Sequence, residues 1–258
     1  MTLRIEALSV RYGERCAVQP TDSTLAGGSL VGLIGPNGAG KSSLLKAIAG
    51  LAAADGLRSW NGTALGAIDE RRRARTVAYL PQQPAAHWPL RVRDLVALGR
   101  LPHRAFGRHA TAADAEAVAW AMDQTEIEPL AERSVDELSG GESARVHLAR
   151  ALAVQAPLLL ADEPVALLDP YHQLQIMTAL ARYASGAKLV IAVMHDLTLA
   201  ARFCARLLLM HEGRIVEDGA PASVLRADAL KRYYRVDPYL GSHDGKPLVV
   251  PWRRYLGA

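Results

Sequence analysis

The residues best suited to chemistry begin with a glycine-rich run, "GPNGAGKS", at residues 35–42. Its glycines permit a loop whose backbone N–H groups turn inward toward one anion. Lys41 adds a mobile positive charge, and Ser42 has a hydroxyl of the kind that Mg²⁺ binds. The run therefore predicts a cradle for the phosphates of a nucleotide, with Mg²⁺ beside it. The residues expected to contact the nucleotide here are Gly35, Pro36, Asn37, Gly38, Ala39, Gly40, Lys41, Ser42 and Ser43.

The flanking sequence has the form that such a loop requires. The apolar run "SLVGLIG" at 29–35 predicts a strand that is buried on both faces of a parallel sheet. After the loop, apolar residues at 44, 45, 48 and 51 follow helical spacing. The strand–loop–helix order makes a chance glycine-rich turn a poor explanation, and the helix adds its positive end to the phosphate site.

Acids and a histidine follow two further apolar runs. "LLLADEP" at 158–164 places Asp162 at the end of a strand, where it can hold Mg²⁺ directly or through water. Glu163 is placed to orient a water molecule that attacks the γ-phosphate. His195 ends the run 188–195 and can donate to the γ-phosphate or to that water. From the residues alone, a structural role for this histidine is an equal alternative.

A second glycine pair lies in "LSGGE", at the start of a helix expected over 142–155. Ser139, Gly140 and Gly141 would leave the helix N-terminus open to an anion. One nucleotide cannot easily contact both surfaces if they lie on different lobes. We therefore expect the second surface to contact a nucleotide held by another copy, across a head-to-tail dimer.

Bulk composition is that of a globular chain. It has 258 residues, of which 50% are hydrophobic and 22% are charged, and its net charge is +4. This mild basic excess permits a nucleic-acid partner, an anionic membrane surface or a solvated face. Cys16 and Cys204 are interpreted as reduced thiols. No secretory signal or apolar run of eighteen residues is seen, so we expect no membrane-spanning segment.

The pattern of expected elements has three parts. An alternating N-terminal stretch predicts two strands, and the run 75–82 predicts another. Residues 90–155 predict helices, including one whose start at Thr111 and Asp114 has a capping-box pattern. Alternating strands and helices then resume, with a hairpin at Glu212–Gly213 and a last helix over 221–234.

Six motifs in one order carry a family resemblance. "GPNGAGKSS", "YLPQQ", "LSGGE", "LLLADEP", "ALLDP" and "VMHDL" resemble the ATP-binding subunit of an ABC transporter over nearly the whole chain. The resemblance implies an α/β fold with a P-loop, RecA-like core, an N-terminal antiparallel β subdomain and an inserted α-helical subdomain. It places the ATPase domain at 1–240, the helical insertion at about 85–155 and a C-terminal tail at 241–258.

The same resemblance implies an ATPase that uses ATP and Mg²⁺, and it assigns four more positions. Tyr12 would stack on adenine. Gln82 would lie in the loop that links the lobes, near Mg²⁺ and the membrane subunit. Asp169 would lie in the loop that crosses the dimer interface, and His195 would be the switch histidine. Catalytic functions are thus expected of Glu163, His195 and Gln82, with Ser42, Gln82 and Asp162 at the metal.

Three positions depart from the usual family pattern. Glu142 stands where glutamine is commonest, "VALLD" stands where a Thr–Ser pair is usual, and Ser43 replaces a common threonine. None of these changes removes an acid, a base or a metal ligand. They bear on the rate of hydrolysis and on dimer affinity, and they leave the family assignment intact.

One segment indicates a particular group of transporters within the family. "LRVRDLVALGRLPHR" at 90–104 is similar to importers for iron–siderophore complexes, haem and cobalamin, and "KPLVVPWRR" at 246–254 indicates the same more weakly. Such ATPases act as two copies with two copies of an integral membrane permease, at the cytoplasmic face of the cell membrane. A substrate-binding protein takes part indirectly, and nucleic acid does not.

Other functions are less well supported. An ABC exporter ATPase is the nearest alternative. A soluble ABC ATPase that acts on DNA or ribosomes would fit the basic run 71–75, but the chain has one ATPase unit and no long heptad segment. A GTPase or kinase would give "LSGG" no function, and a guanine-reading N-K-x-D run is absent.

Overall fold

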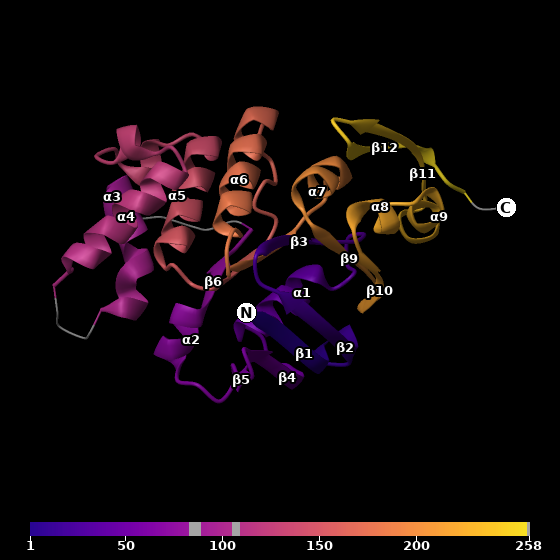
Figure 1. The fold of residues 1–258 in the computed structure, drawn as a ribbon, viewed down its shortest axis with the longest axis horizontal. Helices are drawn as coiled ribbons and strands as arrows, with labels where there is room; N and C mark the ends of the chain where they lie inside the picture. The colour runs from indigo at the N-terminus through magenta and orange to yellow at the C-terminus, as the bar shows by residue number, and fades with distance from the viewer. Residues whose placement is uncertain (83–88, 105–108, 257–258) are drawn as a thin grey trace.

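A mostly parallel sheet forms the centre of the molecule (Figure 1). The computed structural model describes residues 1–82, 89–104 and 109–256. The strands of this sheet are β3 (Ser29–Ile34), β6 (Val77–Leu80), β7 (Leu158–Ala161), β8 (Leu189–Val193), β9 (Arg206–His211) and β10 (Arg214–Gly219). Their order is β10-β9-β3-β8-β7-β6, and only the β9–β10 pair is antiparallel within this sheet.

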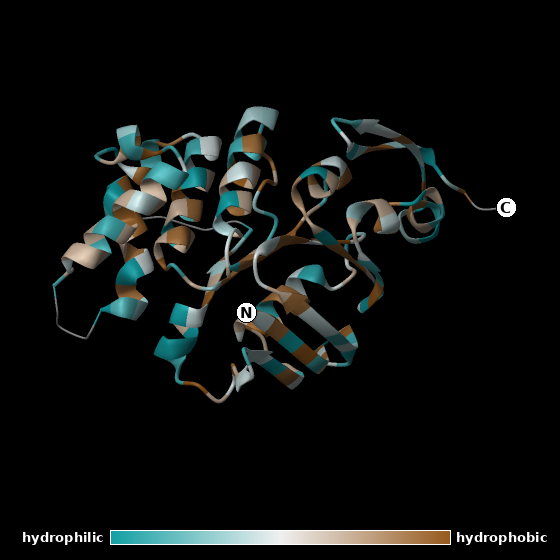
Figure 2. Ribbon diagram, viewed as in Figure 1, coloured by the Kyte–Doolittle hydropathy of each residue, from teal (hydrophilic) through white to brown (hydrophobic). Residues whose placement is uncertain are grey.

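Both faces of the parallel strands are covered, which explains their continuous apolar sequences (Figure 2). On β3, Leu30 and Ile34 belong to a core shared with the helices α5 (Gly140–Ala153), α6 (Pro170–Tyr183) and α7 (Leu197–Phe203). Val31 and Leu33 point to a second core that includes α1 (Lys41–Ala49). The expected strand 29–35 and the helix after it are therefore present.

A smaller antiparallel sheet packs on the α1 side. Its order is β2-β1-β4-β5, and its strands are β1 (Thr2–Tyr12), β2 (Arg15–Ala26), β4 (Asp55–Trp60) and β5 (Thr63–Ala64). The alternating N-terminal sequence predicted β1 and β2. It did not predict β4 and β5, because the first three residues of β4 are exposed and carry no apolar alternation.

A helical segment lies at one end of the molecule, opposite the C-terminus (Figure 1). It contains α3 (Val92–Ala97), a 3₁₀ helix (Leu98–His103), α4 (Ala112–Gln124) and α5. The capping box at the start of α4 is present, with Thr111 and Asp114 exchanging hydrogen bonds. This arrangement confirms the predicted α/β fold class with an inserted helical subdomain. The expected start of that insertion, at residue 85, lies outside the described residues.

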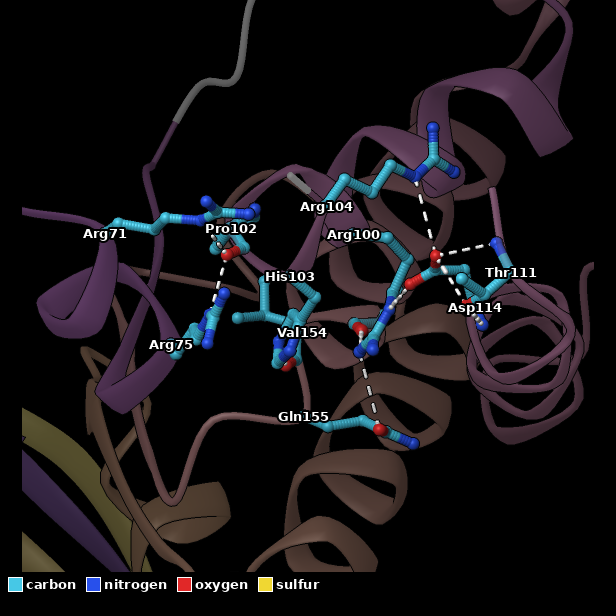
Figure 3. Close-up of polar contacts among 11 residues, drawn as sticks. Arg71, Arg75, Arg100, Pro102, His103, Arg104, Thr111, Asp114, Val154 and Gln155 are labelled. Atoms are coloured by element: carbon cyan, nitrogen blue, oxygen red, sulfur yellow. Dashed lines mark hydrogen bonds and ion pairs between the residues drawn. The ribbon is translucent and has the colours of Figure 1, made fainter. Parts of the chain in front are cut away.

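The 3₁₀ helix joins three parts of the chain (Figure 3). Arg100 is buried and donates to Asp114 at 2.9 Å and to the carbonyl oxygen of Ala153, at the end of α5, at 2.7 Å. Arg71 and Arg75, from α2 (Glu70–Thr76), both donate to the carbonyl oxygen of Pro102, at 2.9 and 2.7 Å. These contacts fasten the helical segment to the α2 side of the core.

Two expectations for secondary structure were inaccurate. α2 takes residues 75 and 76, so the strand expected over 75–82 is shortened to β6. The helix expected over 221–234 is divided into α8 (Pro221–Val224), α9 (Ala227–Ala229) and a π-helical turn (Leu230–Tyr234). Leu225 breaks it, because its backbone angles (φ −89°, ψ 43°) are not helical.

The C-terminal residues form a hairpin of β11 (Val236–His243) and β12 (Lys246–Arg254). It is fixed to α7, since the Thr198 hydroxyl donates to the Val249 carbonyl at 2.8 Å and accepts from the Val249 N–H at 3.1 Å. The domain boundary expected between residues 240 and 241 therefore falls inside β11.

Within residues 1–82, 89–104 and 109–256, no helix combines the length and the apolar character needed to cross a bilayer.

Candidate nucleotide-binding site

The loop between β3 and α1 has a backbone that requires glycine. Gly35, Gly38 and Gly40 have φ values of 147°, 78° and 98°, in the region that L side chains rarely adopt. A Cβ on Gly35 would collide with the Met210 carbonyl, and one on Gly40 would collide with the Ala17 carbonyl. The neighbouring strands therefore hold the loop tightly. The Ala39 N–H donates to the Pro36 carbonyl at 3.3 Å, and the turned backbone of the other loop residues suits an anion.

Lys41 begins α1 and folds back over its own loop. Its Nζ donates to the carbonyl oxygens of Gly35 at 2.8 Å and Pro36 at 2.9 Å. Burial lowers the pKa of Lys41, while the nearby charges of Glu163 and Asp162 act in the opposite direction. The ammonium is thus held at the floor of the loop, next to where a phosphate would lie.

Asp162 is buried directly after β7, and two hydroxyls donate to its carboxylate. Ser42 Oγ donates to Oδ1 at 2.7 Å, and Tyr79 Oη donates to Oδ2 at 2.9 Å. β8 separates β3 from β7 in the sheet, so Ser42 on α1 makes the connection to the phosphate loop. A carboxylate and a hydroxyl suit Mg²⁺, which completes its shell with water and phosphate oxygens. Across the described residues, this site included, no group of three or more His, Cys, Asp or Glu side chains could hold a metal, so water and phosphate oxygens would have to supply most of the ligands here.

Glu163 is held between two other side chains that follow strand ends. His195 Nε2 lies 2.7 Å from one carboxylate oxygen, and Gln82 Nε2 donates to the other. Gln82 follows β6, and His195 follows β8. Glu163 has φ 50°, which is uncommon for a residue other than glycine. The structure thus brings three of the sequence-predicted residues together.

A cavity of about 280 Å³ lies over the phosphate loop. Tyr12, at the end of β1 and 52% exposed, lines this cavity. Glu163 also lines it. An aromatic face, a nest of N–H groups and an acid therefore border one cavity, as a nucleotide and an attacking water require. The lining residues are Tyr12, Arg15, Ala17, Asn37, Gly38, Ala39, Gly40, Lys41, Ser42, Ser43 and Glu163.

Ser139 caps α5, but it lies apart from this cavity. Its hydroxyl accepts from the Glu142 N–H at 3.3 Å, and the Glu142 carboxylate accepts from the Ser139 N–H at 2.9 Å. Hydrogen bonds from the Ser139 backbone N–H and then from its side chain to the carboxylate lower the pKa of Glu142, and the reciprocal bonding gives this glutamate a capping function. Among the described residues, Ser139, Gly140 and Gly141 do not line the cavity over the phosphate loop.

The two glycines of "LSGGE" differ in their surroundings. A Cβ on Gly140 would meet nothing within 4 Å, so this side of the helix start is open. A Cβ on Gly141 would collide with the ring of His172. Asp169 caps α6 and holds that ring, with 2.8 Å between Oδ2 and Nδ1. Packing against His172 within the same chain is therefore one reason for a glycine at position 141. Access for a phosphate, expected from the sequence, would be a second reason.

Sequence reasoning missed Tyr79 and Arg15. Tyr79 lies on β6, which pairs with β7, and a tyrosine in an otherwise apolar strand beside the Asp162 strand was a usable signal. Arg15 follows the turn after Tyr12, and its place beside the phosphate loop depends on the tertiary structure.

Comparison with known proteins identifies the family. The profile described as "ABC transporter" matches residues 18–166, which is more than half of the chain. This chain belongs to the ABC transporter family. Its matched segment is the ATP-binding domain of that family, and the chain is accordingly an ATPase.

Close relatives match over nearly the full length. A hemin import ATP-binding protein of Pseudomonas fluorescens is 41% identical, over 96% of this chain and 99% of the relative. An iron(3+)-hydroxamate import ATP-binding protein of Bacillus subtilis is 36% identical, over 92% of this chain and 88% of the relative. A cobalamin import ATP-binding protein of Halobacterium salinarum is 39% identical, over 96% of this chain and 64% of the relative.

Solved structures share the fold. A metal-chelate type ABC transporter in an inward-facing conformation has a TM-score of 0.83 at 22% identity, over 99% of both chains. A dimeric bacterial ABC transporter cassette has a TM-score of 0.74 at 25% identity, over 85% of this chain and 98% of that chain. The ABC ATPase fold is thereby established for this chain.

Proposed function

We propose that this ABC ATPase powers the import of a metal chelate, such as an iron–siderophore complex, haem or cobalamin, through a separate permease. Relatives that match nearly the whole chain are import ATP-binding proteins for hemin, iron(3+)-hydroxamate and cobalamin. The observation that carries the ATPase mechanism is the Glu163 carboxylate, held by His195 and Gln82 at the edge of the phosphate-loop cavity. The exporter alternative has in its favour a fold likeness to an ABC exporter at 23% identity, over 90% of this chain and 41% of that chain, and a likeness at that identity supports the fold alone.

In this proposal the chain's own residues position the triphosphate and a water. Tyr12 stacks on adenine, the 35–42 backbone surrounds the phosphates, and Lys41 neutralises the β- and γ-phosphates. Glu163 orients the water that attacks the γ-phosphate, while His195 and Gln82 hold Glu163 and contact the γ-phosphate region. Ser42, Asp162 and the nearby Gln82 would hold Mg²⁺, which supplies positive charge against the phosphate oxygens. Catalysis is then mainly alignment and charge neutralisation.

The proposed assembly is a head-to-tail dimer. Ser139, Gly140 and Gly141 do not line the cavity of their own chain, and their helix start is open on the Gly140 side, so a second copy's ATP is a suitable ligand for them. A related cassette is dimeric, at 25% identity. Closing the dimer would complete two sites at once and couple ATP binding to a movement of both helical segments.

The partners follow from that assembly. We place the chain at the cytoplasmic face of the cell membrane, bound to permease subunits, with a substrate-binding protein acting indirectly. The basic run 71–75 does not favour nucleic acid, because Arg71 and Arg75, although exposed, both donate to the Pro102 carbonyl of their own chain.

Glu163→Gln tests the ATPase mechanism. Turnover should fall by at least about 100-fold, because an amide cannot orient and polarise the water as a carboxylate does. ATP should still bind, so the variant should form a dimer with ATP that light scattering detects. Glu116→Gln, an exposed change on α4, is the control and should leave both readouts unchanged. Hydrolysis at the wild-type rate by Glu163→Gln would refute the assigned role.

The transported solute is tested separately. The chain, its permease and its binding protein are reconstituted in vesicles, and ATP turnover is measured with ferric siderophore, haem and cobalamin in turn. One of these chelates should stimulate turnover. Stimulation by none of them, with stimulation by an unrelated solute, would refute metal-chelate import.

A further inference from the structure

Arg15, which belongs to none of the sequence motifs, lines the nucleotide cavity. Arg15 begins β2, directly after the turn that follows Tyr12, and the two residues are paired partners in the β1–β2 hairpin. Both side chains line the cavity over the phosphate loop. The aromatic side chain and the guanidinium are therefore held together by one hairpin end.

The guanidinium reaches the phosphate loop itself. Its Nη2 lies 4.0 Å from the point that a Cβ on Gly38 would occupy. Gly38 has none, and its φ of 78° belongs to the inward-turned loop. Arg15 thus stands over the loop segment whose N–H groups are available to an anion.

The charge of Arg15 has no acidic partner among the described residues. Arg15 is exposed and belongs to none of the ion pairs found there. The one acid on the cavity wall, Glu163, is already bonded to His195 and Gln82. Lys41 is likewise engaged with its own loop carbonyls. Among the described residues that line the cavity, the guanidinium is therefore the cation left without a carboxylate partner, and an anionic ligand would supply one.

We propose that Arg15 binds the α- and β-phosphate oxygens of the nucleotide. This inference rests on the proposed ATP site, with adenine on Tyr12 and the terminal phosphates at Lys41. Since Arg15 pairs with Tyr12 and stands over Gly38, it lies between the base and the end of the triphosphate. A guanidinium can donate two parallel hydrogen bonds to phosphate oxygens, which an ammonium cannot.

Affinity measurements with ATP and ADP test this assignment. ATP and ADP share the α- and β-phosphates, so Arg15→Gln should weaken binding of both by a similar factor. We expect about tenfold, the typical effect of losing a hydrogen bond to a charged group. The measurement is isothermal titration of Arg15→Gln, Arg15→Lys and the wild type, at low and high salt. Arg15→Lys should recover part of the affinity, and the loss in Arg15→Gln should shrink at high salt.

Arg11→Gln is the matched control. Arg11 is an exposed arginine on β1, next to Tyr12, and it does not line the cavity. Its replacement should leave both affinities unchanged. Binding by Arg15→Gln within twofold of wild type for both nucleotides would overturn the proposal. A loss confined to ATP would also overturn it, because the contact would then be to the γ-phosphate.

Lys41→Ala separates this inference from the proposed function. If Lys41→Ala binds ATP as the wild type does, the ATP site itself is wrongly placed. If Lys41→Ala loses binding and Arg15→Gln does not, the ATP site stands and only the function of Arg15 is refuted.

Discussion

At the scale of single residues, the site depends on side chains that hold one another. Asp162 and Glu163 are adjacent in sequence, yet different partners fix them: Ser42 and Tyr79 donate to the first, while His195 and Gln82 contact the second. The left-handed backbone of Glu163 turns its carboxylate away from the direction that a regular strand would give. In the proposed mechanism, these two neighbouring acids would therefore serve two different purposes.

Tyr79→Phe tests whether the tyrosine positions the metal ligand. The change removes one hydrogen bond to Asp162, so the carboxylate can rotate away from the direction that Mg²⁺ needs. The Mg²⁺ concentration for half-maximal ATP turnover should rise roughly tenfold, as is usual when a partner of a metal ligand is lost. Tyr239→Phe, an exposed change in the C-terminal hairpin, should have no effect. An unchanged Mg²⁺ requirement in Tyr79→Phe would show that Asp162 needs no such support.

The sequence predicted the residues of this site better than their partners. The glycines, Lys41 and the two acids could be found because their types and order follow from phosphate and metal chemistry. Arg15 could not, because its position depends on the β1–β2 turn lying over the phosphate loop. Tyr79 left only one signal, a tyrosine in an apolar strand, and its contact with Asp162 depends on β6 lying beside β7. Such strand neighbours are set by long-range packing, which local patterns do not encode.

At the scale of elements, α5 is a stiff connection between distant parts. Ser139 caps its first turn, while Arg100 holds the Ala153 carbonyl and His103 lies 2.8 Å from the Val154 carbonyl at its far end (Figure 3). Arg100 and Asp114 are both buried, so removing Asp114 would leave Arg100 without a carboxylate, whereas Asp114 without Arg100 would keep only Arg104, at 3.8 Å. The 3₁₀ helix is therefore tied both to α4 and to the far end of α5.

His147 in the middle of α5 makes stability depend on pH. It is buried, and neither ring nitrogen has a hydrogen-bond partner. Burial lowers its pKa from 6.5 to about 4, with a smaller contribution from Arg150. Between these two values the unfolded chain binds a proton that the native chain does not, so His147 makes stability fall as the pH drops from about 6.5 to about 4.

His147→Leu should remove that part of the pH dependence. It should also raise the free energy of unfolding at pH 7 by about 1 kcal/mol, because a buried polar group without a partner costs roughly 1–3 kcal/mol. Urea unfolding of both proteins from pH 7 to pH 4 measures this. His109→Leu, at an exposed position, should keep the wild-type slope. Parallel stability curves for His147→Leu and the wild type would contradict the interpretation.

Elements with strong local signals were predicted well, and weakly marked ones were not. The capping box at Thr111 identified the start of α4, and the Glu212–Gly213 turn identified the β9–β10 hairpin. The helical periodicity of 221–234 gave no indication of the break at Leu225. β11 and β12 also escaped prediction, since their hairpin gains its stability by packing on α7.

At the scale of the whole molecule, the two surfaces that we propose to bind phosphate, the 35–42 loop and residues 139–141, do not border one cavity in a single copy. The loop at 35–42 lies in the core, and Ser139 begins a helix of the inserted segment. If each ATP contacts the phosphate loop of one copy and the Ser139 helix of the other, dimers made of two different mutant subunits should behave differently from dimers whose sites are each completed by one chain.

Mixed dimers of Lys41→Ala and Gly140→Arg subunits test this sharing. A Cβ at Gly140 would meet no described atom within 4 Å, so we expect the arginine to block an incoming partner's phosphate and to leave its own subunit's fold intact. If sites are shared, one intact site remains, and this mixture should bind ATP and retain measurable turnover.

The opposite mixture is the control. A subunit carrying both changes, paired with a wild-type subunit, leaves each shared site with one defect and should be inactive. If each chain completes its own site, the two mixtures exchange their results. That exchange would refute the head-to-tail arrangement.

The position of β8 has a consequence for where motion can occur. β8 is hydrogen-bonded to β3 on one side and to β7 on the other, so it joins the strand before the phosphate loop to the strand before the two acids. A shift of β8 along its axis would break its hydrogen bonds to both β3 and β7. The backbone amides of β3, β7 and β8 should therefore exchange slowly with deuterium, and ATP should not change the exchange rate of any of these strands. Changes in exchange should instead appear near α2 and Pro102, where the two parts of the chain meet.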